Sequence, residues 1–316
     1  MPSLSRSSRK RANSPVGLDI DGRFLAAVQV DGQSVARVVS QDLTPGVTED
    51  GEVRDDAALT EALKAMFKAH NLPRNVRLGI SNSQIVVRHL EMPLIEDQKE
   101  RDAAVRFQAS EAIAMPLDEA VLDYQPIGAT QGTDGAVRQR ILLVAARESM
   151  VSRIVAAVKA AGLKPESVDL DAFALVRTLS EPESENGDDL RPARVLCHLG
   201  GTTNLAIAAG SICFFTRALS TVWDVENGGA AGALAEEIRL CIDYHLAQPD
   251  ARPVNEIVLS GPGAHDESLA AELASRAGMP VSVAEPLGDL GTHAVLAGDD
   301  PYRYTVAAGL ALGATA

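Results

Sequence analysis

The sequence predicts an α/β protein with two similar lobes. At 316 residues the chain is too long for one small hydrophobic core and long enough for two. Hydrophobic residues make up 46% of the chain but aromatic residues only 3%. Its cores must therefore consist mainly of Ala, Val, Leu and Ile, which suits buried strands flanked by helices. A strand–turn–strand pattern also occurs twice, so we expect a duplicated fold.

The two copies of this pattern lie far apart in the sequence. In residues 16–30, two apolar strands flank a turn at Asp21-Gly22, because Asp-Gly accepts the positive φ that a tight turn needs. Residues 195–209 repeat the arrangement, with Gly200-Gly201 at the turn. Each lobe is therefore expected to begin with a β-hairpin.

The repeat also predicts where the chain divides. Setting Asp19 against His198 aligns Gly22 with Gly201, at an offset of 179 residues (198 minus 19), which is more than half of the chain. Residues 181–192 combine Pro, Asn and Gly with five acidic side chains, which is the composition of a linker. We expect a disordered basic leader at 1–15, a first lobe at 16–192 and a second lobe at 193–316.

Helical and strand patterns alternate through the rest of the chain. Helices are predicted at 59–70, 96–113, 149–161, 232–247 and 266–277. Strands are predicted at 76–80, 85–90, 141–146, 167–170 and 256–259. In the helix at 96–113, we expect Ala103, Ala104, Phe107 and Glu111 near one face. The apolar stretch 304–310 is expected to pack in a core.

Charge and cysteine content exclude several classes of protein. A formal charge of −14 argues against a nucleic-acid-binding protein, because neutralising phosphates needs a basic face. The leader contains one basic cluster, which comprises Arg6, Arg9, Lys10 and Arg11. This cluster either belongs to a solvated tail or is weakly attracted to anionic lipid. Cys197, Cys213 and Cys241 lack metal-site spacing, so we expect buried thiols. No stretch resembles a membrane span or a secretory signal.

Three glycine-containing turns follow apolar strands, at Asp21-Gly22, Gly200-Gly201 and Gly261-Pro262-Gly263. Such turns let backbone N–H groups approach a ligand closely, which is how phosphates are commonly bound. Each turn alone is more typical of an ordinary loop, but the set of three at these separations is much more specific. The pattern is therefore typical of turns that bind phosphate or another anion.

Two such hairpins and a later strand–glycine-loop–helix unit resemble the actin, Hsp70 and sugar-kinase superfamily, and within it the PilM family of type IV pilus proteins. The resemblance runs from residue 16 to residue 313. It rests on four stretches, which match PilM better than FtsA, actin or the kinases: 87–93 (VRHLEMP), 106–124, 142–163 and 259–264 (LSGPGA).

This resemblance implies an actin-like two-lobed fold with a PilM- or FtsA-type inserted subdomain at about 83–163. Relatives bind ATP between the lobes and the cytoplasmic N-terminal peptide of the membrane protein PilN. Further partners that it implies are other pilus platform proteins, pilus motor ATPases and a second copy of the chain. We therefore expect a cytoplasmic protein attached to the inner membrane through a partner, with a peptide groove on the first lobe and its insertion.

Carried over to this sequence, the resemblance implies nucleotide contacts at Asp19, Asp21, Gly22, Arg23, Gly200, Gly201, Thr202, Thr203, Asn204, Glu237, Gly261, Gly263 and Ala264. Asp19 and Asp21 are the candidates for Mg²⁺. Glu237 either reaches the ribose or lies on a solvated helix face. In the third turn, Pro262 replaces a family glycine and removes an N–H.

The phosphate turns depart from the family pattern, Asp-Ile-Gly. The first turn here is Asp19-Ile-Asp21 and the second is His198-Leu-Gly200. Neutral histidine is a poor ligand for Mg²⁺, which prefers oxygen. Asp21 either repels the phosphates, shares Mg²⁺ with Asp19 or faces solvent. The sequence therefore predicts a degenerate nucleotide site in which ATP and Mg²⁺ are not assured.

These features favour a scaffold of type IV pilus assembly, with slow ATPase activity at most. An active ATPase or small-molecule kinase on the same fold is the enzyme alternative, but it needs a catalytic base and an intact metal site. The third possible function is that of an FtsA-like filament protein. It would carry an amphipathic membrane helix, for which the sequence gives no pattern.

Overall fold

The computed structural model describes residues 14–32, 34–131, 135–180, 191–221, 223, 231–248, 251–287, 290 and 299–313. The basic cluster of the predicted leader and most of the predicted linker lie outside these ranges. The chain divides into two compact units, 1–83 with 155–316 and 84–154. We call them the main unit and the inserted unit.

The main unit contains a five-stranded mixed sheet in the order β10-β6-β1-β2-β3. β1 pairs antiparallel with β2, and it pairs parallel with β6, which is parallel to β10. The strands are β1 (Val16–Ile20), β2 (Phe24–Asp31), β3 (Ser34–Asp42), β6 (Asn75–Ile80) and β10 (Lys164–Leu170). A short hairpin of β4 (Thr48–Glu49) and β5 (Glu52–Val53) follows β3.

A second five-stranded sheet of the main unit repeats this topology in the order β13-β12-β11-β14-β15. β11 pairs antiparallel with β12 and parallel with β14, which is parallel to β15. The strands are β11 (Ala193–Leu199), β12 (Thr203–Ala209), β13 (Ile212–Leu219), β14 (Val254–Ser260) and β15 (Val281–Val283). Both predicted hairpins are confirmed.

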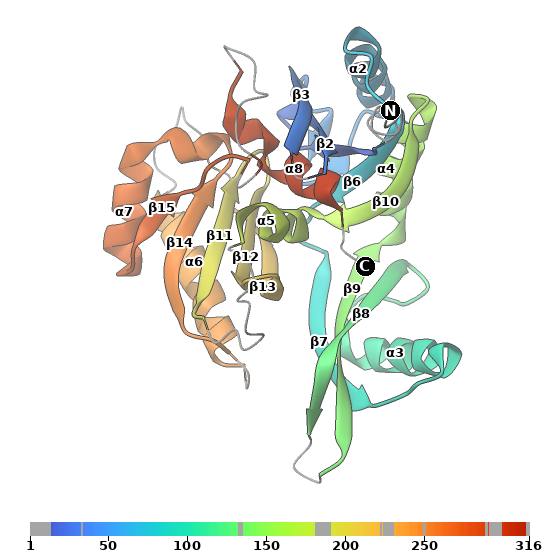
Figure 1. The fold of residues 1–316 in the computed structure, drawn as a ribbon, viewed down its shortest axis with the longest axis vertical. Helices are drawn as coiled ribbons and strands as arrows, with labels where there is room; N and C mark the ends of the chain where they lie inside the picture. The colour runs from blue at the N-terminus through green and yellow to red at the C-terminus, as the bar shows by residue number, and fades with distance from the viewer. Residues whose placement is uncertain are drawn as a thin grey trace, which may run out of the picture. The chain divides into compact units, whose positions relative to one another are not determined.

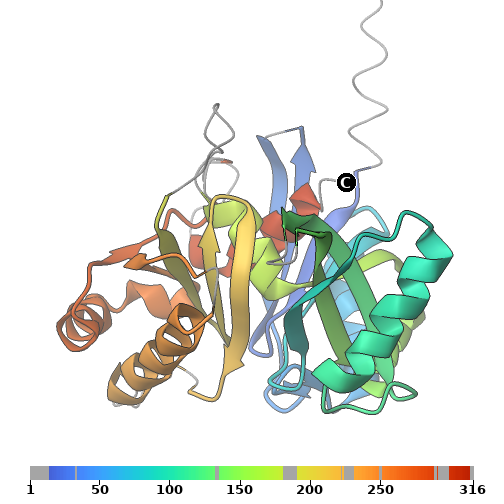
Figure 2. The same cartoon turned by 90° about the horizontal axis from the view of Figure 1, so that it is seen from below.

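Two helices lie between the sheets, as Figures 1 and 2 show: α5 (Asp171–Leu179) and α8 (Thr305–Leu312). The helix α8 contacts β1, β2 and β6, and α5 contacts β11 and β12 as well as α8. Residues 305–311 are almost fully buried, as expected of the apolar stretch. The predicted second lobe includes α8, but α8 packs on the first sheet.

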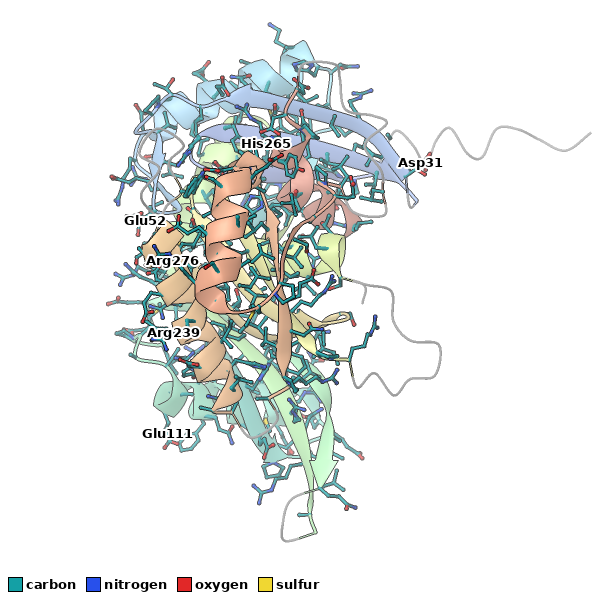
Figure 3. All side chains as sticks on the ribbon, turned by 90° about the vertical axis from the view of Figure 1, so that its left-hand side faces the viewer. Asp31, Glu52, Glu111, Arg239, His265 and Arg276 are labelled. Atoms are coloured by element: carbon teal, nitrogen blue, oxygen red, sulfur yellow. The ribbon has the colours of Figure 1, made fainter. Side chains whose placement is uncertain are left out.

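The opposite face of the second sheet is covered by α6 (Ala231–Leu246) and α7 (Glu267–Ala277), which contribute to one apolar core with β11 and β12. Figure 3 shows Arg239 on α6 and Arg276 on α7, on the outer surface of these neighbouring helices. Beside the first sheet, α2 (Asp56–Ala69) contacts β3, and Thr60 donates to the carbonyl of Ala157 in α4 (Glu148–Ala160).

The inserted unit is a three-stranded antiparallel sheet in the order β7-β9-β8, with α3 on one face (Figure 1). Its elements are β7 (Val86–Pro93), α3 (Gln98–Ala112), β8 (Ala120–Gln131) and β9 (Val137–Arg147). The predicted helix is confirmed as α3, but its predicted face is mostly exposed, with only Ala104 of the four residues packed against the core. Val105 and Ala109 are buried, whereas Phe107 is 68% exposed. This helix has few large apolar side chains, so its periodicity was a weak signal.

The remaining expectations concern cysteines and membrane spans. Cys197 and Cys241 are buried as expected, but Cys213 on the edge strand β13 is only partly buried. Among the described residues, no helix is long and apolar enough to cross a membrane.

Candidate functional site

The first predicted turn joins β1 to β2 at the carboxyl end of β1. Asp19 is the second-last residue of β1 and is 3% exposed. Gly22 has a φ of 106°, and the N–H of Asp21 donates to the carbonyl of Phe24 at 3.1 Å. The positive φ explains why the sequence has glycine at this position. The turn holds the Asp21 side chain beyond the end of the strand.

The second turn, between β11 and β12, contacts the first turn directly. The N–H of Gly201 donates to Oδ2 of Asp21 at 2.7 Å. A Cβ atom added to Gly200 would lie 2.1 Å from the same oxygen, and one added to Gly201 would lie 2.4 Å from the Asp21 carbonyl oxygen. The two glycines are therefore required for the close approach of the turns.

The first half of the main unit is the part with the sheet β10-β6-β1-β2-β3, and the second half is the part with the sheet β13-β12-β11-β14-β15. Two further contacts join these halves. Nη2 of Arg23 donates to the carbonyl of Trp223 at 2.5 Å, and the hydroxyl of Ser81 donates to Oδ1 of Asn204. The buried hydroxyl of Thr203 has no hydrogen-bond partner within the described ranges, and Thr202 is partly buried. Of the predicted nucleotide contacts, Arg23 and Asn204 are thus engaged in bonds within the protein.

A third carboxylate, which the sequence analysis missed, belongs to this region. Asp171 is the first residue of α5, directly after β10, and its buried Oδ1 has no hydrogen-bond partner among the described residues. Because β1, β6 and β10 run parallel, their carboxyl ends share one edge of the sheet, as do Asp19 and Asp171. An Asp that follows a predicted strand and begins a helix was the available signal.

Burial changes the protonation of these carboxylates. It raises the pKa of Asp171 to about 8, with the charges of Asp21 and Asp169 adding to the effect. Burial and the neighbouring Asp171 and Asp21 raise the pKa of Asp19 as well. Burial raises the pKa of Asp21 to about 6, although the N–H groups of Gly201 and Arg23 oppose the rise. Burial therefore favours the protonated forms of Asp171 and Asp19, whereas the Gly201 and Arg23 N–H groups favour the ionised form of Asp21.

The counterpart of Asp19 in the second half is a neutral ring. Nδ1 of His198 lies 3.1 Å from Oγ of Ser260, and its buried Nε2 has no hydrogen-bond partner in the part of the chain that the structure describes. Burial lowers the pKa of His198 to about 4. The imidazole is therefore uncharged at neutral pH and contributes no counter-charge to the carboxylates.

The third predicted turn packs closely on β11. Gly261 has a φ of 82°, and an added Cβ would lie 2.7 Å from the carbonyl oxygen of Leu199. A Cβ at Gly263 would lie 2.5 Å from Cδ1 of Trp223. The next residue, Ala264, is 3% exposed. Close packing inside the second half accounts for both glycines.

Glu237 lies on α6, where its carboxylate bonds to the segment that follows β13. It accepts from the N–H of Ser220 at 3.3 Å and from the N–H of Thr221 at 3.0 Å. The Asp21–Gly201 bond joins the first two turns. The bonds of Glu237 instead hold the segment that follows β13.

These residues do not fit a magnesium nucleotide as they stand. Asp21 already accepts the Gly201 N–H that would otherwise meet a phosphate oxygen. The side chain of His198 is buried and neutral. Within the described ranges, no three Asp, Glu, His or Cys side chains are placed to hold a metal ion. The site instead pairs a donor of one turn, the Gly201 N–H, with an acceptor of the other, the Asp21 carboxylate.

Two sheets of identical topology, joined through facing hairpin turns, define an actin-like protein, and comparisons with known proteins place it further. The family model described as type IV pilus assembly protein PilM matches residues 17–208, more than half of the chain. The chain therefore belongs to the PilM family.

Two solved structures support the fold assignment. The chain is similar to a protein in a structure titled "PilM-PilN type IV pilus biogenesis complex", with a TM-score of 0.80 and 22% identity over 95% of this chain and 98% of that one. It is also similar to the ethanolamine utilization protein EutJ from Carboxydothermus hydrogenoformans, with a TM-score of 0.51 and 14% identity over 96% and 93% of the two chains. The predicted actin-like α/β fold is confirmed.

Proposed function

We propose that this PilM-family protein is a scaffold of type IV pilus assembly that binds the cytoplasmic N-terminal peptide of a PilN-like membrane protein. The observation that carries the proposal is the family match over residues 17–208. The likeness to a protein whose structure is described as a PilM–PilN complex supports this choice of partner. In this role the chain would work in the cytoplasm and reach the inner membrane through its partner.

The sheet of the inserted unit offers features that suit an extended peptide. Ile141, Leu143 and Ala145 of β9 pack in the apolar core with α3. Because side chains alternate along a strand, Leu142 and Val144 lie on the opposite face. Both are partly exposed. This second face therefore presents apolar side chains outside the core.

The neighbouring strands extend that apolar face. Val87 of β7 pairs with Val144 of β9, and Val121 of β8 pairs with Ala146. Val121 is 42% exposed. The outer strands β7 and β8 also have edges on which a peptide strand can add, with backbone hydrogen bonds giving affinity and alternate side chains giving specificity. We propose this face and its edges as the peptide surface.

ATP with Mg²⁺ is not part of the proposal. The Asp21–Gly201 bond and the neutral His198 oppose it, and no observation favours the kinase or ATPase alternative. A fold shared with enzymes does not itself supply a reaction. The function proposed is therefore binding, with no chemical step.

Fluorescence anisotropy with a labelled N-terminal peptide of the PilN-like protein tests the proposal. The unmodified chain is expected to bind this peptide and not a scrambled peptide of equal composition. Val121→Asp should weaken binding at least tenfold, which corresponds to about 1.4 kcal/mol. The reason is that it places a charge on the proposed apolar surface.

Phe107→Asp is the matched control, because Phe107 is also exposed but lies on α3, outside the proposed surface. It should leave the affinity unchanged. If the unmodified chain does not bind the peptide, the proposed function is wrong. If Val121→Asp binds as well as Phe107→Asp, the function stands and the proposed surface is wrong.

A further inference from the structure

The contact between the first two turns leads to an inference that does not depend on peptide binding. We infer that Asp21 is an internal anion that ties the two halves of the main unit together and excludes external phosphate from the second turn. The donor in this arrangement is the backbone N–H of Gly201, and the acceptor is Oδ2 of Asp21, 2.7 Å away.

The acceptor chemistry of the carboxylate is the first part of the argument. Glycine-containing turns bind anions through N–H groups that point out of the chain. Carboxylate and phosphate oxygens are both strong acceptors for such donors. The Gly201 N–H is already directed at an anion of this kind. A phosphate that used the same donor would have to displace Asp21.

The fit around Asp21 is too tight for a second anion beside it. An added Cβ at Gly200 would lie 2.1 Å from Oδ2 of Asp21, and one at Gly201 would lie 2.8 Å from Oδ1. A phosphate is larger than a methyl group. The space between the turns therefore accepts either Asp21 or a phosphate, and the two are competitors.

Other contacts hold Asp21 in place. Its Oδ1 accepts from the N–H of Arg23 at 3.3 Å, and the Arg23 guanidinium donates to the carbonyl of Trp223 in the other half. Ser81 and Asn204 form a further bond between the halves. The carboxylate therefore belongs to a set of polar bonds that needs no ligand to join the two hairpins.

Charge adds to the exclusion. The N–H groups of Gly201 and Arg23 oppose the rise in the pKa of Asp21 and favour its carboxylate form. Asp19 and Asp171 are the other acidic side chains that interact with it, and Arg23 and Arg303 are the cations. Like charges at short range repel strongly in partly buried surroundings. The Asp21 carboxylate thus repels an incoming phosphate as well as filling its position, and Arg23 and Arg303 offset part of this repulsion.

A double-mutant cycle on the full chain tests the contact. Gly200→Ala should lower the ratio of folded to unfolded protein at least tenfold, because its Cβ meets the Asp21 carboxylate. In an Asp21→Ala background the same change should cost at least fivefold less, since the obstructing oxygen is gone. In an Asp21→Asn background the full cost should return, because the amide fills the same volume. Denaturant titration measures all six proteins.

Calorimetric titration tests the exclusion of phosphate. The probes are inorganic tripolyphosphate, and ATP with and without Mg²⁺. The unmodified chain should bind none of them with micromolar affinity, and Asp21→Ala should bind tripolyphosphate at least tenfold more tightly. Asp118→Asn is the matched control for net charge, because Asp118 is exposed in the inserted unit. It should behave as the unmodified chain.

The inference requires both results. It is supported if Gly200→Ala is tolerated only without the carboxylate and if removing the carboxylate strengthens tripolyphosphate binding. It is overturned if the unmodified chain binds ATP or tripolyphosphate with micromolar affinity. It is also overturned if Gly200→Ala costs the same in all three backgrounds, or if Asp21→Ala and Asp118→Asn bind the probes equally.

Discussion

The hairpins β1–β2 and β11–β12 have the same place in two sheets of the same topology, yet their chemistry is opposite. The first contributes carboxylates at Asp19 and Asp21. The second has the neutral His198 and the N–H of Gly201. Backbone topology depends on apolar patterning, whereas the polar residues at the strand ends are free to differ. Duplication of the fold therefore does not duplicate the site, and here the two copies complement each other.

A similar contrast appears two residues earlier in each strand. With the 179-residue offset, Gly17 of β1 corresponds to Leu196 of β11. Gly17 lies against the backbone of α8, whereas Leu196 packs with Ala172 and Val176 of α5. At this position the backbone of β1 directly contacts the backbone of α8. In the second sheet, the Leu196 side chain fills the space between β11 and α5. Exchanging features between the halves tests how far this comparison holds.

The largest effect is expected for Gly17→Ala. Its Cβ would lie 2.0 Å from the carbonyl oxygen of Ala307 and 2.4 Å from the backbone nitrogen of Ala311, so α8 must move. We expect a loss of about 3 kcal/mol in the free energy of unfolding, as for overpacking of a rigid core. Denaturant titration measures this loss.

Gly162→Ala is the control for this variant. Gly162 has a φ of 80°, but an added Cβ would have no atom of the described residues within 4 Å. Its cost should be about 1 kcal/mol, from backbone conformation alone. Equal losses in the two variants would contradict the view that α8 rests on the β1 backbone.

His198→Asp is expected to have the next largest effect. It gives the second hairpin the carboxylate of the first, at a position that is 1% exposed. Burying a charge there should cost about 2 kcal/mol or more at pH 7. The loss should shrink at pH 5, where a buried carboxyl becomes protonated. The control is His198→Asn, because both variants lack the imidazole whose lowered pKa makes the unmodified chain itself less stable at pH 5. Denaturant titration should show the stability difference between the two variants shrinking from pH 7 to pH 5, and an unchanged difference would mean that the charge is not the cause.

Asp171→Asn should change the pH dependence of stability. The folded-state pKa of Asp171 is raised to about 8 from an unfolded value of 3.8, so folded protein binds a proton that unfolded protein has lost. The stabilisation is fully present below the unfolded pKa and is lost as the pH rises through about 8. Asp171→Asn should remove this decline, whose slope is at most about 1.4 kcal/mol per pH unit. Denaturant titrations across this range measure the slopes, and equal slopes would contradict the prediction.

The smallest effect is expected for Arg23→Ala. It removes the bond to the Trp223 carbonyl that joins the halves, which should cost about 1 kcal/mol. Trp223 is the single tryptophan of the chain, so its fluorescence reports unfolding of this region.

Arg37→Ala is the matched control, because Arg37 bonds to the His70 and Asn71 carbonyls within the first half. It should leave the Trp223 emission of the folded protein unchanged. An equal emission shift in both variants would mean that Arg23 has no special role between the halves.

Sequence patterns were strongest where local chemistry decides structure. Asp21-Gly22 and Gly200-Gly201 predicted both hairpins, and helical periodicity predicted α2, α4, α6 and α7. Other elements gave weak signals. β8 contains Pro126 and Gly128, with an irregular pairing between them, so its strand pattern is interrupted.

The sequence by itself determined the duplicated α/β fold, because strand and helix periodicities and turn glycines act between residues close together in the chain. Only the tertiary structure brought Asp21 to Gly201, 180 residues away, and placed Asp171 near Asp19. Such contacts depend on how sheets and helices pack, and packing also decides which charges are buried. The sequence therefore predicted which turns matter, whereas the tertiary structure decided that one turn supplies the anion that the other binds.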